Sequence, residues 1–158
     1  MSDIGTGEWR FGPVGEADFE PLLVMRTAVM REHLDRVGRY TPERSRRVFR
    51  EHFDEPGMRL IRLGGERVGC VGFRTSDSEI KIDSFYLDPR LHNTGLGTKI
   101  LKALLDEADA TGLPVRLEVL NGSKAARFYL RRGFTKLSED EIEGYYERPC
   151  RGRSSSDD

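Results

Sequence analysis

Residues 85–97 read FYLDPRLHNTGLG, and this stretch decides the fold. It opens with Phe85-Tyr86-Leu87, whose aromatic and apolar side chains are typical of a buried strand. Asp88-Pro89 ends that strand, because proline lacks the N–H group that a sheet ladder requires. Gly95 and Gly97 follow, and a helical pattern begins directly after them. The stretch therefore predicts a strand, a glycine-containing loop and a helix in direct succession.

A glycine loop that leads into a helix is a common way to bind phosphate. Glycine lets the backbone approach a ligand closely, and the unpaired N–H groups at the start of a helix attract anions. Glycines also occur at purely structural turns between strands and helices. On its own the loop leaves both interpretations open, so the surrounding elements have to decide.

Upstream of the loop, the sequence predicts three strands connected by tight turns. Residues 58–63, 68–73 and 79–87 are rich in β-branched, apolar and aromatic residues. Gly64-Gly65 reads as a hairpin turn, and residues 75–78 read as a second turn. The middle of the chain is therefore expected to form an antiparallel meander.

Two helices are expected before the meander, at residues 17–37 and 41–53, after a short strand at residues 8–11. Thr41 and Pro42 are typical of the N-cap and first turn of the second helix.

Downstream of the loop, the pattern is helical at residues 98–110, where the leucines fall on one face. A strand at residues 115–120, a helix at residues 124–132 and a last strand at residues 143–147 follow. This order of elements predicts an α/β (α+β) domain with a mixed sheet.

The familiar nucleotide-binding motifs do not fit this loop. In a P-loop, lysine directly precedes the Ser or Thr that opens the helix, whereas here Lys99 follows Thr98. A dinucleotide fingerprint has a third glycine and lies at the start of a βαβ unit, whereas an antiparallel meander precedes this loop. Both folds are excluded on these grounds.

Composition indicates one domain at residues 1–149 with a polar tail at residues 150–158. The chain has 158 residues, and 37% of them are hydrophobic, which is enough for a single core. Its 26 basic and 27 acidic residues give a net charge of -1, so neither nucleic acid nor an anionic membrane is expected as a partner.

Cysteine and histidine usage argues against a disulfide framework and a metal site. Only Cys70, inside an apolar run, and Cys150, beside the tail, are present, and the three histidines show no zinc-site spacing. We expect no metal, and Cys70 fits a role in core packing. Because no apolar segment resembles a signal peptide or a membrane span, we expect a cytoplasmic protein.

Two segments together resemble the GCN5-related N-acetyltransferase (GNAT) family. The first is the 85–97 stretch, which is similar to the central family motif of Gln or Arg, two residues, Gly, one residue, and Gly or Ala. The second is AARFYLRRGF at residues 125–134. The resemblance implies a mixed, mostly antiparallel sheet with helices on both faces, and acetyl-CoA as the co-substrate.

The resemblance also implies which residues bind acetyl-CoA. The backbone of Leu87 would polarise the thioester carbonyl, and the glycine loop would hold the pyrophosphate. His92 stands where the family has Gln or Arg, so the backbone is expected to matter more than this side chain. The full set of expected cofactor-binding residues is Tyr86, Leu87, His92, Asn93, Thr94, Gly95, Leu96, Gly97 and Thr98.

Acetyl transfer to an amine also needs a base that takes a proton from the amine. Some family members carry a base in a Leu-Glu-Val context, which makes Glu118 the first candidate here. Another branch places its base on the strand before the glycine loop, where this chain has Lys81, with Glu79 and Asp83 on the same face. Glu118 is equally explained as a solvated strand residue paired with Arg116 or Lys81.

Tyr129 occupies the position of the family's general acid. A phenol with a pKa near 10 can protonate a thiolate whose thiol has a pKa near 8.5. The alternative is a helix-face aromatic residue that packs beside Phe128 and Phe134.

The acceptor is expected to be a primary amine of a small molecule or a protein. Residues 22–53 are rich in arginine, which fits solvated helix faces better than a specific acidic acceptor. The alternatives are a non-catalytic acyl-CoA-binding sensor and a general phosphate-ligand module. A homodimer is possible if a strand near Tyr145-Tyr146 pairs across a two-fold axis instead of finishing its own sheet.

Overall fold

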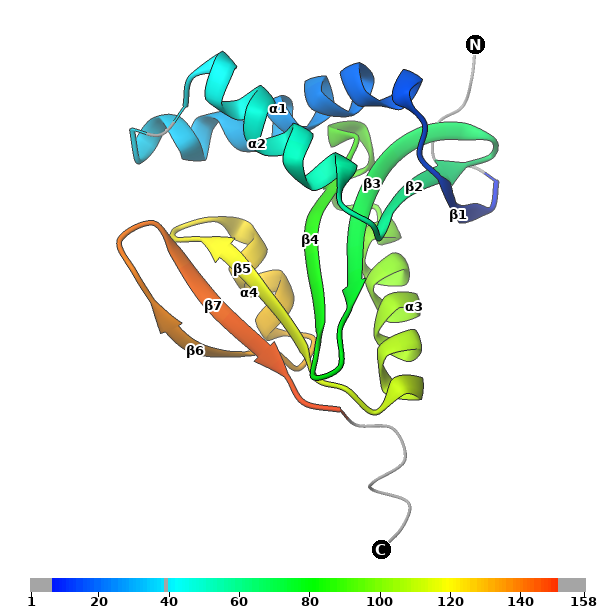
Figure 1. The fold of residues 1–158 in the computed structure, drawn as a ribbon, viewed down its shortest axis with the longest axis vertical. Coiled ribbons are helices and arrows are strands. Elements are labelled where there is room, and N and C mark those ends of the chain that lie inside the picture. Colours follow the sequence, from blue (N-terminus) through cyan, green and yellow to red (C-terminus); the bar gives the residue numbers. More distant parts are fainter. Residues whose placement is uncertain (1–6, 39, 151–158) are drawn as a thin grey trace, which may run out of the picture.

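The computed structural model describes residues 7–38 and 40–150 and shows one mixed sheet flanked by helices (Figure 1). In chain order, its elements are β1 (Trp9–Pro13), η1 (Glu16–Asp18), α1 (Phe19–Arg36), α2 (Pro42–Asp54), β2 (Met58–Leu63), β3 (Glu66–Thr75), β4 (Ile80–Leu87), η2 (Pro89–Leu91), α3 (Leu96–Thr111), β5 (Val115–Leu120), α4 (Lys124–Leu130), β6 (Thr135–Glu139) and β7 (Glu143–Arg148).

The sheet has seven strands in the order β1-β2-β3-β4-β5-β7-β6. Every neighbouring pair is antiparallel except β4 and β5, which are parallel. These two strands pair only at Ile80 with Val115 and at Lys81 with Arg116. Beyond these pairs they diverge, and Figure 1 shows β4 and β5 separating toward α1 and α2. We call this region the β4–β5 divergence.

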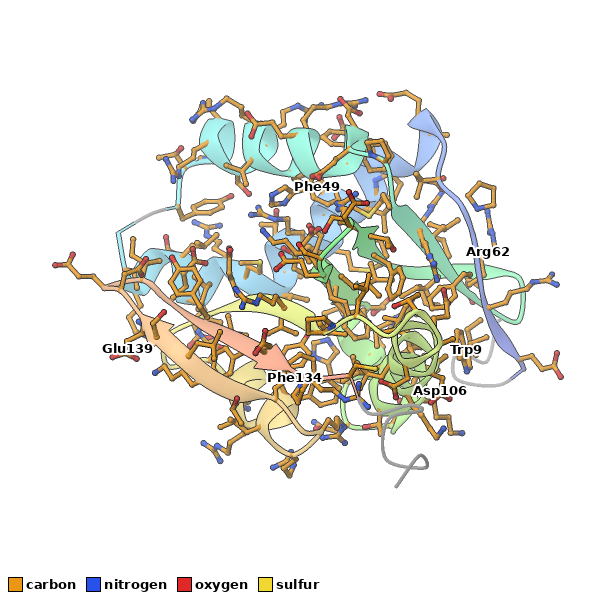
Figure 2. The ribbon with its side chains drawn as sticks, turned by 60° about the horizontal axis from the view of Figure 1, so that its bottom comes forward. Trp9, Phe49, Arg62, Asp106, Phe134 and Glu139 are labelled. Carbon is orange, nitrogen blue, oxygen red and sulfur yellow. The ribbon has the colours of Figure 1, made fainter. Side chains whose placement is uncertain are left out.

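Helices cover both faces of the sheet, and each face has its own apolar core. On one face, Phe19 of α1 and Phe49 of α2 pack against β2 and β3. On the other face, α3 packs against β3, β4 and β5, and Phe134 lies in the same cluster. In Figure 2, Phe49 and Phe134 lie inside the molecule, whereas Asp106 and Glu139 lie at its surface. The predicted fold class is confirmed.

A bulge in β4 separates its two halves. Cys70 pairs with Tyr86 and Gly72 with Asp83, so β4 has one more residue than β3 between these pairs. Ser84 lies in this bulge and has a φ of 49°, which few non-glycine residues adopt. The bulge changes which residues of β4 face α1 and α2, so both Asp83 and Tyr86 contact that side.

One strand was not predicted from the sequence, and several helices and strands begin or end at other residues than predicted. β6 was not expected, because all five of its residues are exposed and TKLSE has no apolar alternation. β1 extends two residues past the expected end at residue 11, through Gly12 and Pro13, because an edge strand tolerates proline. α3 begins at Leu96, two residues before Thr98, and α4 ends at Leu130.

Of the two alternatives for the strand near Tyr145-Tyr146, the structure shows the second. β7 pairs with β5 on one side and with β6 on the other, so it finishes its own sheet and has no free edge. The expected polar tail lies outside the described residues except for Cys150, whose thiol lies 3.9 Å from the Asp109 carbonyl. In the described ranges, no helix is long and apolar enough to cross a membrane.

Candidate active site

The loop between β4 and α3 presents its main chain at the start of a helix. Gly95 is the N-cap of α3 and has a φ of 91°, and Asn93 has a φ of 65°. A Cβ atom added at Gly95 would have no neighbour within 4 Å, so the space beside it is open. The first N–H groups of a helix have no intrahelical acceptor and lie at the positive end of its dipole. The loop therefore has the geometry of an anion site.

Two residues of this loop stabilise its conformation. The Thr94 hydroxyl donates to the Leu91 carbonyl at 2.6 Å and accepts from the Leu96 amide at 3.4 Å. The Leu96 side chain is buried in the core beneath α3. These side chains hold the loop in shape, while its main chain remains the group available to a ligand.

The start of α3 lies against α4. From the position of a Cβ at Gly97, Leu87 is 3.6 Å away and Phe128 is 3.9 Å away, so a larger side chain would fill this space. Arg132 donates to the Thr98 hydroxyl at 2.6 Å, and its guanidinium lies over the Phe128 ring at 4.3 Å. A cation missed by sequence reasoning therefore lies beside the helix start. Only its place in the second motif could have indicated it.

A groove of about 640 Å³ runs between α3 and α4. Its lining includes Arg131, Arg132, and Lys102, which pairs with Asp106 of the same lining at 2.9 Å. The two arginines lie on the same side of the sheet as the glycine loop, so an anionic ligand extending from the loop would meet a net positive charge.

Leu87, the last residue of β4, has its backbone N–H and C=O groups in the β4–β5 divergence. The Asp88 amide donates to the Val68 carbonyl at 2.8 Å. Because ladder bonds alternate along an antiparallel pair, the N–H and C=O of Leu87 point away from β3, toward the side where β5 has diverged. His92 Nε2 lies 3.0 Å from the Leu87 carbonyl oxygen. The Leu87 N–H is thus a main-chain donor in the divergence, and the His92 ring contacts the end of β4.

Tyr129 reaches the same region from α4. Its ring makes edge contacts with Phe128 and Phe134 at centroid distances of 5.2 and 5.4 Å, and the residue is 8% exposed. Its hydroxyl has no hydrogen-bond partner among residues 7–38 and 40–150. Burial, and to a smaller extent the nearby Tyr86 hydroxyl, raise the pKa of Tyr129 above its ordinary value. Tyr129 is therefore a protonated phenol at neutral pH.

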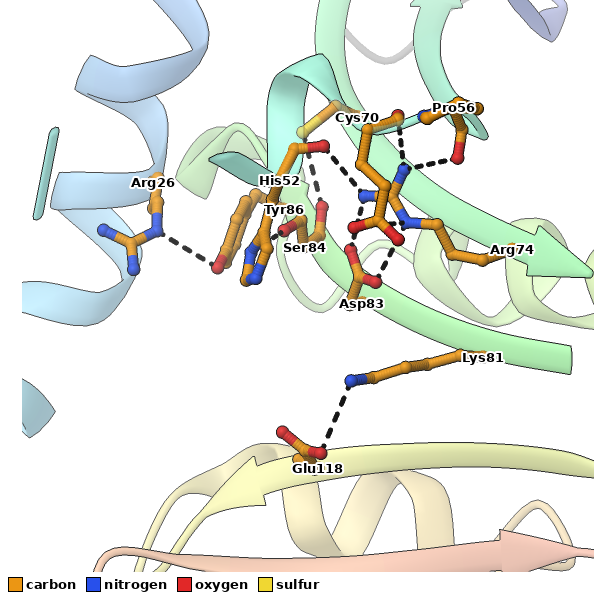
Figure 3. Close-up of polar contacts among 11 residues, drawn as sticks. Arg26, His52, Pro56, Cys70, Arg74, Lys81, Asp83, Ser84, Tyr86 and Glu118 are labelled. Atoms are coloured by element: carbon orange, nitrogen blue, oxygen red, sulfur yellow. Dashed lines mark hydrogen bonds and ion pairs between the residues drawn. The ribbon is translucent and has the colours of Figure 1, made fainter. Parts of the chain in front are cut away.

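Glu118 and Lys81 face each other across the divergence. Lys81 Nζ lies 3.4 Å from Glu118 Oε2, and both side chains are partly exposed (Figure 3). Glu118 is thus paired with Lys81, one of the two partners expected from its place in the strand. The alternatives on β4 are also paired: Glu79 lies 3.6 Å from Arg116, and Asp83 receives two bonds from Arg74 at 2.9 and 3.1 Å.

Other acidic groups lie beside Glu118. It faces Tyr145 across the β5–β7 pair, and the Tyr145 hydroxyl donates to Asp140 at 2.7 Å. Partial burial raises the pKa of Glu143, and the charges of Glu118 and Asp140 raise it further. This mutual repulsion favours a cation near Glu118 and Glu143.

Arg26 of α1 is buried, so the expectation that the arginines of residues 22–53 cover solvated helix faces is wrong for this residue. It is 6% exposed and donates to the Ser45 hydroxyl at 2.5 Å and to the Tyr86 hydroxyl at 3.3 Å. In contrast, Arg46 and Arg50 are paired at the surface with Glu20 and Glu16, as expected. Arg26 thus fixes Tyr86 at the divergence, a role that no helix pattern in the sequence indicated.

The comparisons with known proteins agree with this geometry. The sequence profile of the acetyltransferase (GNAT) family matches residues 25–134. The chain belongs to the GNAT family. The match includes the glycine loop, Glu118 and Tyr129, as well as part of α1 and all of α2 on the other face. A search among curated proteins found no match to the sequence.

Solved GNAT structures share the whole fold at low sequence identity. The PaiA N-acetyltransferase of Thermoplasma acidophilum, solved with coenzyme A, has a TM-score of 0.71 and 15% identity, covering 90% of this chain and 99% of that one. The ribosomal-protein-S18-alanine N-acetyltransferase of Escherichia coli has a TM-score of 0.69 and 14% identity, with coverages of 93% and 97%.

A third similar structure is the N-acetylglutamate synthase of Neisseria gonorrhoeae, solved with coenzyme A and N-acetyl-glutamate. It has a TM-score of 0.62 and 17% identity, and the match covers 92% of this chain but only 36% of that one. At these identities the three structures show the fold, and they do not identify an acceptor.

Proposed function

We propose that this GNAT domain transfers an acetyl group from acetyl-CoA directly to a primary amine. The observation that carries the proposal is the arrangement at the β4–β5 divergence. There β4 supplies the Leu87 N–H, the β4–α3 loop supplies an open helix start, and α4 supplies the Tyr129 hydroxyl, which has no partner among the described residues. A Cβ at Gly97 would lie 3.6 Å from Leu87 and 3.9 Å from Phe128, the neighbour of Tyr129 in α4. Together they supply a donor for a carbonyl oxygen, a proton for a leaving group, and an anion site.

The residues on the α3 side fit coenzyme A. The open main chain at Gly95 and the cation of Arg132 suit a pyrophosphate at the helix start. The Ser123 hydroxyl at the start of α4 is buried and has no partner in the part of the chain that is described. It is a further group that a polar ligand could satisfy. The Thermoplasma and Neisseria structures were solved with coenzyme A, which supports the same choice.

The main chain and Tyr129 would act on the thioester. Acetyl-CoA supplies an activated acyl group, and the Leu87 N–H would stabilise the oxyanion that forms on its carbonyl. Tyr129 would donate a proton to the departing thiolate, since its buried phenol is protonated and has no acceptor among the residues that the structure describes. His92 would act through its contact with the Leu87 carbonyl and not as a phosphate ligand.

The acidic groups on the opposite side fit a cationic acceptor. Glu118 and Glu143 lie on adjacent strands, and their repulsion would be relieved by an ammonium group. Glu118 remains a candidate base, but the ammonium of Lys81 already lies at its Oε2 atom. An incoming amine would have to share that carboxylate with Lys81.

Thermal unfolding in the presence of acetyl-CoA, coenzyme A and ATP tests the cofactor assignment. A ligand that binds only the folded state raises the Tm as its concentration increases. We expect acetyl-CoA and coenzyme A to stabilise the protein and ATP to do so weakly or not at all. Stabilisation by ATP alone would reject the acetyltransferase assignment in favour of a general phosphate-binding module.

Thiol release with a panel of amines separates an enzyme from an acyl-CoA sensor. Suitable acceptors are a short peptide with a free N-terminus, an N-acetylated lysine amide and spermidine. We expect thiol release that depends on at least one of them. Binding of acetyl-CoA without release by any amine would indicate the sensor.

A further inference from the structure

His52 lies at the acceptor side of the divergence, where no motif placed a functional group. It belongs to the last turn of α2, and its Nδ1 atom lies 3.2 Å from the Ser84 hydroxyl oxygen. Ser84 is the buried bulge residue of β4, three positions before Leu87. Figure 3 shows the His52 ring beside Tyr86 and Ser84, extending toward the space above Lys81 and Glu118.

The end of α2 that carries His52 is fastened to the sheet. Arg74 Nη2 donates to the His52 carbonyl at 2.9 Å, while Nη1 donates to the carbonyls of Glu55 and Pro56 at 2.7 and 2.9 Å. The same guanidinium is paired with Asp83 of β4, and its side chain is only 9% exposed. The imidazole is thus held by its backbone at one end and by Ser84 at the other.

One ring nitrogen of His52 is left for a ligand. Nδ1 is engaged with Ser84, whereas Nε2 has no hydrogen-bond partner within residues 7–38 and 40–150. A proton on Nδ1 that is donated to Ser84 leaves a lone pair on Nε2. Figure 3 shows Tyr86, Asp83 and Arg74 around this ring, with Arg26 bonded to Tyr86 on the α1 side and with Lys81 and Glu118 across the divergence.

We propose that His52 is the general base of the acetyl transfer, with Nδ1–H donated to Ser84 and Nε2 facing the acceptor amine directly or through one water. The inference rests on the proposed function and goes beyond it, because it moves the base from β5 to the end of α2. It also gives the bulge a role, since Ser84 reaches Nδ1 from its unusual backbone conformation.

The proposed acetyl transfer proceeds in the following order. Nε2 takes one proton from the acceptor ammonium, and the free amine attacks the thioester carbonyl carbon. A C–N bond forms and the C–S bond breaks, and Tyr129 protonates the departing thiolate. The remaining extra proton on nitrogen passes through water to the Tyr129 phenolate, which restores the phenol. His52 then returns its proton to solvent.

His52 suits this step better than Glu118 for two reasons. Imidazole is by its chemistry a stronger base than a carboxylate, so a histidine is better matched to proton removal from an ammonium group. The ammonium of Lys81 already lies at the Glu118 carboxylate, whereas no group in the described part of the chain lies at hydrogen-bond distance from Nε2 of His52. Glu118 would then attract the ammonium and His52 would take its proton.

The tautomer of His52 in the free protein gives a test that needs no acceptor. NMR of isotope-labelled histidine distinguishes Nδ1–H from Nε2–H, and the spectrum of His52→Gln assigns the signals. We expect the Nδ1–H tautomer in the wild type and its loss in Ser84→Gly, which keeps the backbone conformation accessible but removes the hydroxyl. An Nε2–H tautomer in the wild type would overturn the proposal.

Kinetics of matched variants give the second test, with acetyl-CoA and the best amine of the panel. We expect His52→Gln to lower kcat by about 10²-fold or more, at the lower end of the range for general base catalysis. His33→Gln, on α1 where the His33 ring lies 3.2 Å from the Arg36 guanidinium, should match the wild type. Glu118→Gln should raise the KM for the amine with a smaller fall in kcat.

The results distinguish failure of the role proposed for His52 from failure of the proposed acetyltransferase activity. Normal turnover in His52→Gln, together with lost turnover in Glu118→Gln, would overturn the inference and return the role of base to Glu118 while leaving the proposed function intact. If the wild type releases no thiol with any amine, the proposed function fails and the inference fails with it. Unchanged stabilisation of His52→Gln by acetyl-CoA serves as the control for folding.

Discussion

The two sides of the sheet at the β4–β5 divergence are built from different kinds of group. On the α3 side, the groups that face a ligand are mostly main chain: the Leu87 N–H and the open loop around Gly95. On the α1 and α2 side they are side chains, His52 of α2 and Glu118 of β5, while the buried Arg26 of α1 holds Tyr86 beside them. The first arrangement can bind a constant cofactor, and the second can vary with the acceptor.

This difference explains which parts of the molecule tolerate change. Main-chain sites depend on backbone conformation, so a few glycines determine them. Side-chain sites depend on packing between elements, so they are altered by substitutions that leave the fold intact. The following predictions probe each side in turn, from the largest expected effect to the smallest.

Tyr129→Phe should have the largest effect, because it removes the general acid and leaves its ring in place. We expect kcat to fall by about 10²–10⁴-fold, with the Tm shift from acetyl-CoA unchanged. Tyr40→Phe is the matched control, since Tyr40 contacts Arg31 away from the divergence. If Tyr129→Phe turns over as fast as Tyr40→Phe, Tyr129 is not the general acid.

Arg26→Met should destabilise the acceptor side while sparing the glycine loop. It leaves the buried hydroxyls of Ser45 and Tyr86 without their donor. A cost of about 2 kcal/mol in the free energy of unfolding is expected from the loss of such bonds. Chemical denaturation measures it, with the exposed Arg31→Met as control. An unchanged free energy of unfolding would mean that Arg26 does not hold Tyr86 in place.

Gly95→Ala should cost about 1 kcal/mol of stability, because its φ of 91° is unfavourable for a residue with a Cβ. It should also weaken acetyl-CoA binding more than it slows catalysis. Gly12→Ala is the control, since Gly12 has no positive φ and no neighbour within 4 Å of an added Cβ. If both variants bind acetyl-CoA like the wild type, the loop backbone does not hold the cofactor.

Tyr145→Phe should have the smallest effect, which is a change in the pKa of Asp140 alone. Hydrogen bonds from the Glu143 amide, the Tyr145 hydroxyl and the Ile142 amide lower the pKa of Asp140 to about 2. Because the folded-state pKa is below the unfolded value of about 3.9, Asp140 stabilises the fold above that value and loses this effect as pH falls toward 2. The variant should raise the pKa of Asp140, as NMR titration would show, whereas Tyr40→Phe should not.

The sequence allowed the α3 side to be predicted well because its signals are local. The end of β4, the loop glycines and the start of α3 lie within thirteen consecutive residues, and the structure places them as expected apart from the earlier start of α3. Tyr129 was also found from its motif and reaches the divergence. The roles assigned to these residues remain predictions until a ligand is bound.

The acceptor side could be predicted only in part because it forms by contacts between distant segments. Arg26 and Tyr86 are 60 positions apart, and His52 and Ser84 are 32 apart. No helix or strand pattern shows which arginine turns inward, and the β4 bulge that aims Ser84 leaves no periodic signal. β6 was missed for a related reason, since an exposed edge strand has no apolar alternation.

Thiol release from acetyl-CoA, with mass analysis of the acceptor, tests the central claim most directly. The account predicts that the wild type releases one thiol for each acetyl group gained by an amine, and that Tyr129→Phe binds acetyl-CoA but releases thiol far more slowly. Amine-dependent release at equal rates in both proteins would contradict the role of Tyr129. The absence of any acetylated amine, despite tight acetyl-CoA binding, would contradict the claim that this domain is an acetyltransferase.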